Sequence, residues 1–205
     1  MKISMELSYL TLLAVLISVS AKDRYNRFFV FGDSMSDDGI DVTRDLHGFV
    51  KYANGLIYAD YLARTLLRNP HLRLTNYAYS GAYSGEGNYY FSGWSGVQWQ
   101  VREFLKIYNP IPGKSLILYQ AGGINDLFDM DSSKLSNIGP NNLESLQYLA
   151  DAGATDILFL NLLPASKMPY FKSNATQRQA IGELITAANQ VLETETIPTF
   201  KVVQC

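Results

Sequence analysis

The residues best suited to chemistry lie in the segment Phe28–Gly39, which reads FFVFGDSMSDDG. Its first four residues are aromatic or β-branched, a composition typical of a strand buried on both faces of a parallel sheet. Gly32 permits a tight turn after this strand. Ser34 then lies just beyond it, at the carboxyl edge where open α/β sheets bind their ligands. A serine hydroxyl in this position is suited to nucleophilic attack, although the same pattern occurs in many ordinary strand-to-helix loops.

Two further loops carry groups that complement a serine nucleophile. Gly81 follows a predicted strand over 72–78, and Asn125 follows a predicted strand over 115–120. The backbone N–H of a glycine and the side-chain amide of an asparagine can both stabilise the oxyanion of a tetrahedral intermediate. If the strand order is 2-1-3-4-5, the three loops share one edge of the sheet. Their residue types therefore point to acyl transfer.

Strands and helices alternate along the chain, and this alternation must position the three loops. Strands are predicted over 28–31, 72–78, 115–120 and 156–161, with a fifth over 200–203, and helices over 56–67, 97–108, 141–149 and 176–194. This pattern predicts an α/β fold with a parallel five-stranded sheet, a flavodoxin-like three-layer sandwich in one domain.

Three motifs, FVFGDSMSDDG, NYAYSGA and GGIND, resemble the first three blocks of the GDSL esterase/lipase family, within the SGNH hydrolases. The resemblance covers most of the chain. It implies that Ser34 is the nucleophile and that its own backbone N–H is one oxyanion donor. It also implies that the backbone of Gly81 and the side chain of Asn125 are the other two donors. Three aspartates fall on family positions that support the loops by hydrogen bonds: Asp33, Asp37 and Asp126.

The family's catalytic aspartate and histidine lie in an Asp-x-x-His motif after the fifth strand, and this sequence contains no such motif. Its two histidines are His47 and His71, and neither follows an aspartate by three positions. His71 precedes the second predicted strand, at the opposite edge from Ser34, so it is poorly placed as a base. We expect a hydrolase domain that is incomplete at its C-terminus. The alternative is a catalytically inactive secreted protein that binds carbohydrate or lipid.

The N-terminal segment predicts export. Lys2 precedes an apolar run over 7–19, which ends in small residues suited to cleavage after Ala21. We therefore expect a signal peptide over 1–21, a hydrolase domain over 22–205 and a secreted, extracellular protein. The apolar run is shorter than the roughly 20 residues that span a membrane. In a secreted protein, Asn174 in Asn-Ala-Thr is a predicted glycosylation site.

The composition limits the classes of partner and cofactor that we expect. The 205 residues carry a formal net charge of −2 and no basic run, so nucleic acid is not expected. No loop has a nucleotide-binding glycine pattern, and two histidines and one cysteine far apart give no metal site. We expect no cofactor, a monomer without stable membrane insertion, and an ester of a small molecule, polysaccharide or lipid as substrate.

A glycine- and aromatic-rich loop over 84–96, SGEGNYYFSGWSG, stands apart from the other segments. Its aromatic side chains could form a flap or a sugar-facing platform over the pocket. They could instead fold back onto the core, which the sequence slightly favours because aromatic side chains more often bury surface than bind ligands.

Overall fold

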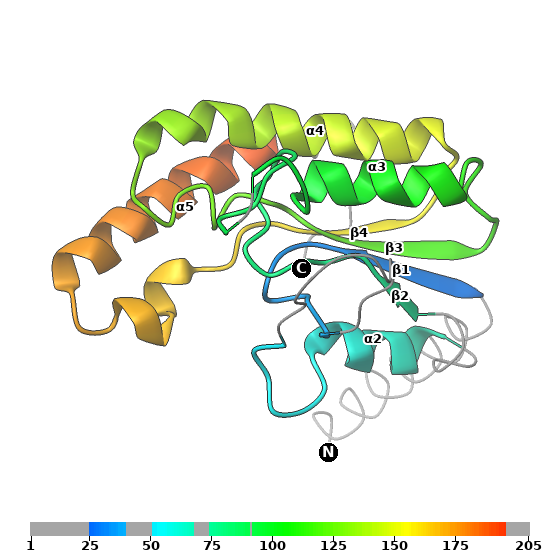
Figure 1. The fold of residues 1–205 in the computed structure, drawn as a ribbon, viewed down its shortest axis with the longest axis horizontal. Coiled ribbons are helices and arrows are strands. Elements are labelled where there is room, and N and C mark those ends of the chain that lie inside the picture. The colour runs from blue at the N-terminus through cyan, green and yellow to red at the C-terminus, as the bar shows by residue number, and fades with distance from the viewer. Residues whose placement is uncertain (1–24, 40–50, 68–73, 91, 196–205) are drawn as a thin grey trace, which may run out of the picture.

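The computed structural model describes residues 25–39, 51–67, 74–90 and 92–195 of the 205 (Figure 1). Its strands are β1 Arg27–Phe31, β2 Leu74–Asn76, β3 Ser115–Gln120 and β4 Ile157–Leu160. Its α-helices are α2 Tyr58–Leu66, α3 Val97–Ile107, α4 Leu135–Asp151 and α5 Ala175–Glu195. Short 3-10 helices are η2 Ser132–Lys134, η3 Ala165–Lys167 and η4 Pro169–Phe171.

The four strands form one parallel sheet in the order β2-β1-β3-β4. The predicted α/β fold with a parallel sheet is thereby confirmed, and so is the relative order of these four strands. The predicted fifth strand over 200–203 and the predicted signal peptide over 1–21 lie outside the described residues, as do His47 and His71.

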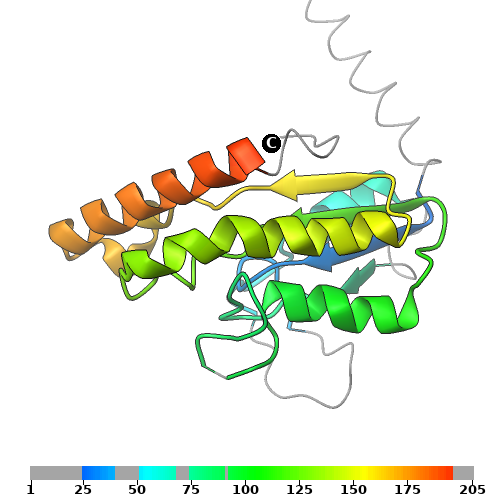
Figure 2. The same ribbon diagram turned by 90° about the horizontal axis from the view of Figure 1, so that it is seen from above.

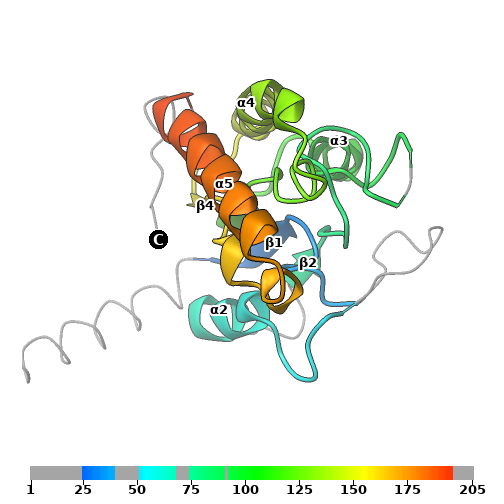
Figure 3. The ribbon, with the colours of Figure 1, turned by 90° about the vertical axis from the view of Figure 1, so that its left-hand side faces the viewer.

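Helices cover both faces of the sheet, which explains the continuous apolar runs in its strands. α2 lies on one side, and α3 and α4 lie on the other (Figures 1 and 3). In β1, Phe29 and Phe31 face α3, where Phe29 packs edge-on against Phe104 with ring centroids 4.7 Å apart. Phe28 and Val30 belong to the separate core beneath α2. A strand in this position has no polar face, so every residue after Arg27 is buried.

α4 and α5 run beside one another, and both contribute to the core on the face of the sheet that α3 covers (Figure 2). The prediction placed the start of α4 at Asn141, whereas the helix begins at Leu135 and contains Pro140. Pro140 is exposed and lies beyond the first turn of α4, so its missing N–H removes one intrahelical hydrogen bond. Asn141 is not an N-cap, because its side chain bonds the Ser84 hydroxyl at 2.9 Å.

β2 is shorter than predicted, but its pairing with β1 continues beyond the strand. The backbone N–H of Tyr77 donates to Val30 O at 2.8 Å, and that of Tyr79 donates to Gly32 O at 3.1 Å. These two bonds keep the chain leaving β2 alongside the chain leaving β1. Among the described helices, none has the length and apolar character that crossing a membrane requires.

Candidate active site

Ser34 lies in a tight turn directly after β1, and the residues on either side of it fix that turn. The Asp33 carbonyl accepts the backbone N–H groups of Ser36 and Asp37, both at 3.0 Å. The Asp33 carboxylate accepts the N–H of Met35 at 2.9 Å. Asp33 is buried and Ser34 is half-buried. The turn therefore presents Ser34 at the carboxyl edge of the sheet while its neighbours are held beneath the surface.

Two buried glutamines brace the backbone before Ser34, and sequence reasoning missed both. Gln100 of α3 accepts the Gly32 N–H at 3.0 Å and donates to Gly32 O at 2.8 Å, so it bonds both backbone groups of that residue. Gln120 at the end of β3 donates to Asp33 Oδ1 at 2.7 Å. The sequence offered one sign of each: Gln120 is a polar residue at the end of an apolar strand, and Gln100 is a polar residue on the apolar face of a helix.

The hydroxyl of Ser36 belongs to the same buried hydrogen-bond network as Gln120. It bonds the side-chain carbonyl of Gln120 and lies 2.5 Å from the Tyr58 hydroxyl. Tyr58 opens α2, so the network connects the turn after β1 with β3 and with the helix on the opposite face. Burial raises the pKa of the Tyr58 phenol, which keeps it neutral at physiological pH.

Asp37 connects the turn to the loop that follows β2. Its carboxylate accepts the backbone N–H of Ser80 at 2.8 Å and that of Gly39 at 2.9 Å. At the end of β2, directly before this loop, Asn76 donates to Ser36 O at 2.7 Å. The residue after Ser80 is Gly81, so these bonds fix the position of the predicted oxyanion donor against the turn that carries the predicted nucleophile.

Gly81 occupies a position that only glycine fits well. Its φ is +80°, in the left-handed region that side chains disfavour. An added Cβ would lie 2.6 Å from Asn88 Oδ1 and 2.8 Å from the Tyr90 ring. Its carbonyl accepts the N–H of Tyr89 at 2.8 Å. The aromatic loop thus packs directly against the predicted oxyanion donor.

The loop after β3 is bonded to the same β2 loop. Asn125 donates from Nδ2 to Ala82 O at 3.0 Å and is half-buried. Because an amide nitrogen carries two hydrogens, a second donor remains for a ligand. The carboxylate of Asp126 accepts both the backbone N–H and the hydroxyl of Ser84, each at 2.8 Å. The structure therefore brings together the three loops that the sequence singled out.

Two buried carboxylates lie at the base of these loops. Burial raises the pKa of Asp33, against hydrogen bonds from Met35 and Gln120 that lower it, and the nearby Asp126 charge raises it further. Burial also raises the pKa of Asp126, opposed by its hydrogen bonds from Ser84. In both cases the loss of water outweighs the hydrogen bonds.

The aromatic loop divides between the two roles considered for it. Trp94 packs back onto the core, edge-on to Tyr79 at 5.8 Å. Tyr89 and Tyr90 remain exposed, and together with neighbouring glycines they line a pocket of about 340 Å³. Phe91 lies outside the described residues.

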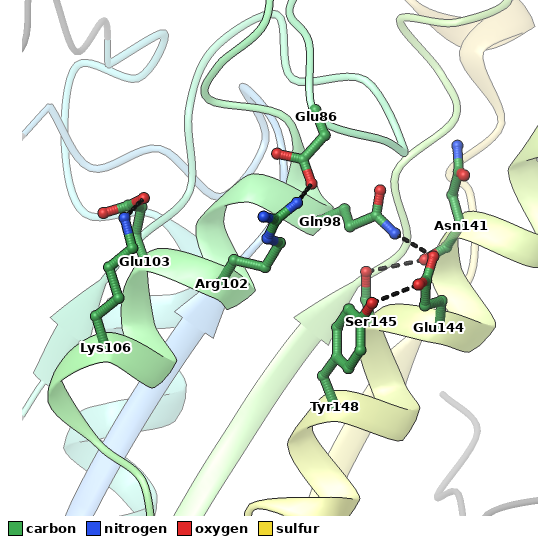
Figure 4. Close-up of polar contacts among 9 residues, drawn as sticks. All are labelled: Glu86, Gln98, Arg102, Glu103, Lys106, Asn141, Glu144, Ser145 and Tyr148. Carbon is green, nitrogen blue, oxygen red and sulfur yellow. Dashed lines mark hydrogen bonds and ion pairs between the residues drawn. The ribbon is translucent and has the colours of Figure 1, made fainter.

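Surface polar contacts join this loop to α3 and α3 to α4 (Figure 4). Glu86 pairs with Arg102 of α3 at 2.7 Å. Gln98 of α3 donates to Glu144 of α4 at 2.5 Å, and the Tyr148 hydroxyl bonds the same carboxylate. These groups are largely exposed, so they orient the loop more than they stabilise it.

Asn174, the predicted glycosylation site, is exposed and precedes α5, where its Oδ1 accepts the N–H of Gln177 at 3.0 Å. In the part of the chain that the structure describes, no three histidine, cysteine or acidic side chains are grouped to hold a metal ion.

No family model matches the chain. Its sequence is similar to thermolabile hemolysin of Vibrio parahaemolyticus, with 28% identity over 162 residues. The match covers 73% of this chain but only 37% of that protein. On its motifs, the chain resembles the GDSL esterase/lipase family. Its fold is similar, at a TM-score of 0.49 and 13% identity, to a solved member of the lipolytic protein G-D-S-L family from Veillonella parvula. That likeness covers 87% of this chain and 76% of the other.

In this chain the GDSL motif reads Gly32-Asp33-Ser34-Met35, with methionine in the last position. Met35 is 40% exposed, next to the predicted nucleophile. It therefore adds apolar surface at the mouth of the site.

Proposed function

We propose that the chain is a secreted serine hydrolase of GDSL type that acts on acyl or acetyl esters of lipid or carbohydrate. The observation that carries this proposal is the bonding between three loops at one edge of the sheet. Asp37 bonds the β1 loop to Ser80, and Asn125 bonds the β3 loop to Ala82. The loops of Ser34 and Asn125 are therefore both fixed against the loop of Gly81.

In the proposed reaction, the Ser34 hydroxyl attacks the ester carbonyl and loses its proton to a general base. The carbonyl oxygen becomes an oxyanion, which accepts hydrogen bonds from the backbone N–H groups of Ser34 and Gly81 and from Asn125 Nδ2. Collapse of this intermediate releases the alcohol and leaves an acyl group on Ser34, and water then releases the acid. The remaining N–H of Asn125 and the lack of a Gly81 side chain support these roles.

The described residues supply no general base for this step. The sequence has no Asp-x-x-His motif, and its two histidines fall outside the described ranges. A serine without a base is barely activated at neutral pH. We therefore expect slow turnover by the 205-residue chain and faster turnover when a segment with Asp-x-x-His is supplied.

The experiment compares hydrolysis of p-nitrophenyl acetate by the 205-residue protein and by the same protein extended with such a segment. The extension should raise the rate by about 10²–10⁴-fold, the usual contribution of a general base. Ser34→Ala should abolish that gain, whereas Ser92→Ala, which alters an exposed serine of the aromatic loop, should not. A gain that survives Ser34→Ala would overturn the proposed nucleophile.

A second candidate is an inactive binding protein, and the pocket of about 340 Å³ favours it because its lining does not include Ser34. Its tyrosines and glycines could hold a ligand whether or not a base is present. If this candidate is correct, the extended protein remains as slow as the 205-residue chain.

A further inference from the structure

Four aromatic rings form a continuous row at the carboxyl edge of the sheet, which we call the aromatic row: Tyr90, Tyr89, Phe128 and Tyr170. Successive ring centroids lie 5.2, 5.9 and 4.8 Å apart. Tyr89 and Tyr90 come from the loop after β2, Phe128 follows β3, and Tyr170 follows β4. Segments that are far apart in the sequence therefore build one surface on the loops next to Ser34.

One ring of the row, Phe128, packs against the core, and the three tyrosines are exposed to solvent. Phe128 is half-buried and packs at 5.3 Å against Phe171, which is fully buried. The three tyrosines are 46%, 61% and 67% exposed at positions 89, 90 and 170. Contiguous exposed aromatic surface on a soluble domain typically marks an interaction site.

A further aromatic side chain, Tyr52, lies next to the Tyr90 end of the row. The Tyr90 ring is partly desolvated, which raises the pKa of its phenol, and a hydrogen bond with Tyr52 raises that pKa further. Tyr52 is itself 64% exposed. The apolar edge thus carries aromatic groups from the segment before α2 and from the loops after β2, β3 and β4.

The ring orientations distinguish between ligands. Successive planes in the aromatic row are inclined by 84°, 72° and 44°. A saccharide chain that stacks on several rings needs their faces turned the same way, and this row does not provide that. A lipid surface accepts rings in any orientation, and tyrosine suits its boundary because the ring is apolar and the hydroxyl is polar.

We propose that the aromatic row docks the protein on a lipid surface, so that the Ser34 loops face lipid esters. This inference rests on the proposed function for its purpose, whereas docking itself requires no catalysis. The docking is peripheral, because only the side chains of the row, at one edge of the protein, enter the lipid. The rest of the fold stays outside the hydrocarbon core of the bilayer.

The charges around the row indicate that docking is driven by apolar contact. Asp129, next to Phe128, is 48% exposed and pairs with Lys134 at 2.8 Å. The chain as a whole carries a formal net charge of −2. Lys167 and Lys172 are exposed on either side of Tyr170, so anionic headgroups can add to binding. The exposed rings do not depend on that charge, and binding should therefore persist in neutral vesicles and in high salt.

The experiment measures flotation of the full chain with vesicles of phosphatidylcholine alone. The wild-type protein should float with the vesicles, and the triple variant Tyr89→Ser/Tyr90→Ser/Tyr170→Ser should lose at least about tenfold in partitioning, since three exposed rings no longer enter the interface. The matched control is Tyr61→Ser/Tyr148→Ser, which removes two exposed tyrosines from helices α2 and α4. That variant should float like the wild type.

The inference would be overturned by a wild-type protein that does not float, or by a control variant that loses as much partitioning as the triple variant. Thermal unfolding of each variant checks that a loss is not due to misfolding. Ser34→Ala should float like the wild type, so a failure of docking is distinguishable from a failure of the proposed hydrolase. Flotation that requires 30% phosphatidylglycerol would replace apolar docking with charge attraction and would also overturn the inference.

Discussion

The loops around Ser34 and the aromatic row lie at the same edge of the sheet, yet they are built in opposite ways. Around Ser34, buried side chains bond several backbone groups: Gln100 bonds three and Asp37 bonds two. In the row, the tyrosines are largely exposed and contact one another through ring edges. The first arrangement fixes atoms before a ligand arrives, whereas the second offers surface without a fixed shape.

This difference separates two tasks that the proposed hydrolase must perform. Catalysis needs donors held within a fraction of an ångström, because the oxyanion appears only in the transition state. Binding an apolar aggregate needs area and tolerates varied ring orientations. Substitutions around Ser34 should therefore disturb the fold and any chemistry together, and substitutions of the exposed rings should disturb binding more than folding.

The largest expected effect on stability comes from Asp37→Ala. This change leaves the backbone N–H groups of Ser80 and Gly39 without their acceptor inside the fold. It should lower the free energy of unfolding by about 2–4 kcal/mol, because charge-assisted hydrogen bonds of a buried group are lost. Urea denaturation measures it. Asp151→Ala, on the exposed face of α4, is the control and should change the free energy of unfolding little. Equal stability of the two variants would contradict the claim that Asp37 stabilises the fold by joining these loops.

A somewhat smaller loss is expected for Gln100→Leu, which keeps the volume but removes both hydrogen bonds to Gly32. The free energy of unfolding should fall by about 2–3 kcal/mol, because both backbone groups of Gly32 and the carbonyl of Ser95 lose their partner. Gln98→Leu, two residues earlier on α3, removes only one partly exposed contact and should cost less. If the two variants unfold at the same urea concentration, Gln100 does not brace the turn.

The pH dependence of stability gives a third test, with Asp33 as the group responsible. Burial raises the pKa of this carboxyl above the ordinary 3.8, so the folded state holds the proton more tightly than the unfolded state. The stabilisation that protonated Asp33 gives the folded state is therefore fully present below pH 3.8. It is lost as the pH rises through the folded pKa. Asp33→Asn removes the charge, and its unfolding midpoint should depend less on pH above pH 4 than that of the wild type.

Asp129 provides a control of opposite sign for that measurement. A hydrogen bond from Lys134 lowers the pKa of this exposed carboxyl. Its small contribution is present above the unfolded pKa and is lost as pH falls. Asp129→Asn should therefore leave the loss of stability above pH 4 unchanged, and a flattened profile in this variant would contradict the assignment to Asp33.

The smallest effect is expected at the surface pair between Glu86 and Arg102. Both side chains are substantially exposed, at 36% and 60%. Arg102→Ala should change the free energy of unfolding by no more than about 0.5 kcal/mol, as is usual for such pairs. A larger loss, measured by the same denaturation, would mean that the base of the aromatic loop is held as firmly as the loops around Ser34.

Much of the scaffold was predictable from the sequence because it depends on local patterns. The apolar runs in β1 and β3 are typical of strands covered on both faces, and their alternation with helices predicts a parallel sheet. The start of α4 was predicted wrongly at Asn141, whereas the helix begins at Leu135 and continues through Pro140.

The loops with Ser34, Gly81 and Asn125 were also visible, since each follows a strand at its carboxyl end. The partners that hold these loops were not, because they lie far away in the chain. Gln100 and Gly32 are 68 positions apart, and no local pattern indicates their pairing. The aromatic row was hidden for the same reason: its rings come from three loops, and only the folded sheet brings them together.

The most direct test of the account is to find which residue becomes modified when the protein, extended with an Asp-x-x-His segment, reacts with diethyl p-nitrophenyl phosphate. This reagent places a diethylphosphoryl group on an activated serine and releases p-nitrophenol. Peptide mass spectrometry should locate one group per chain on Ser34, formed far faster than in the 205-residue protein. A label on other serines or on exposed tyrosines such as Tyr90, with Ser34 unmodified, would contradict the account.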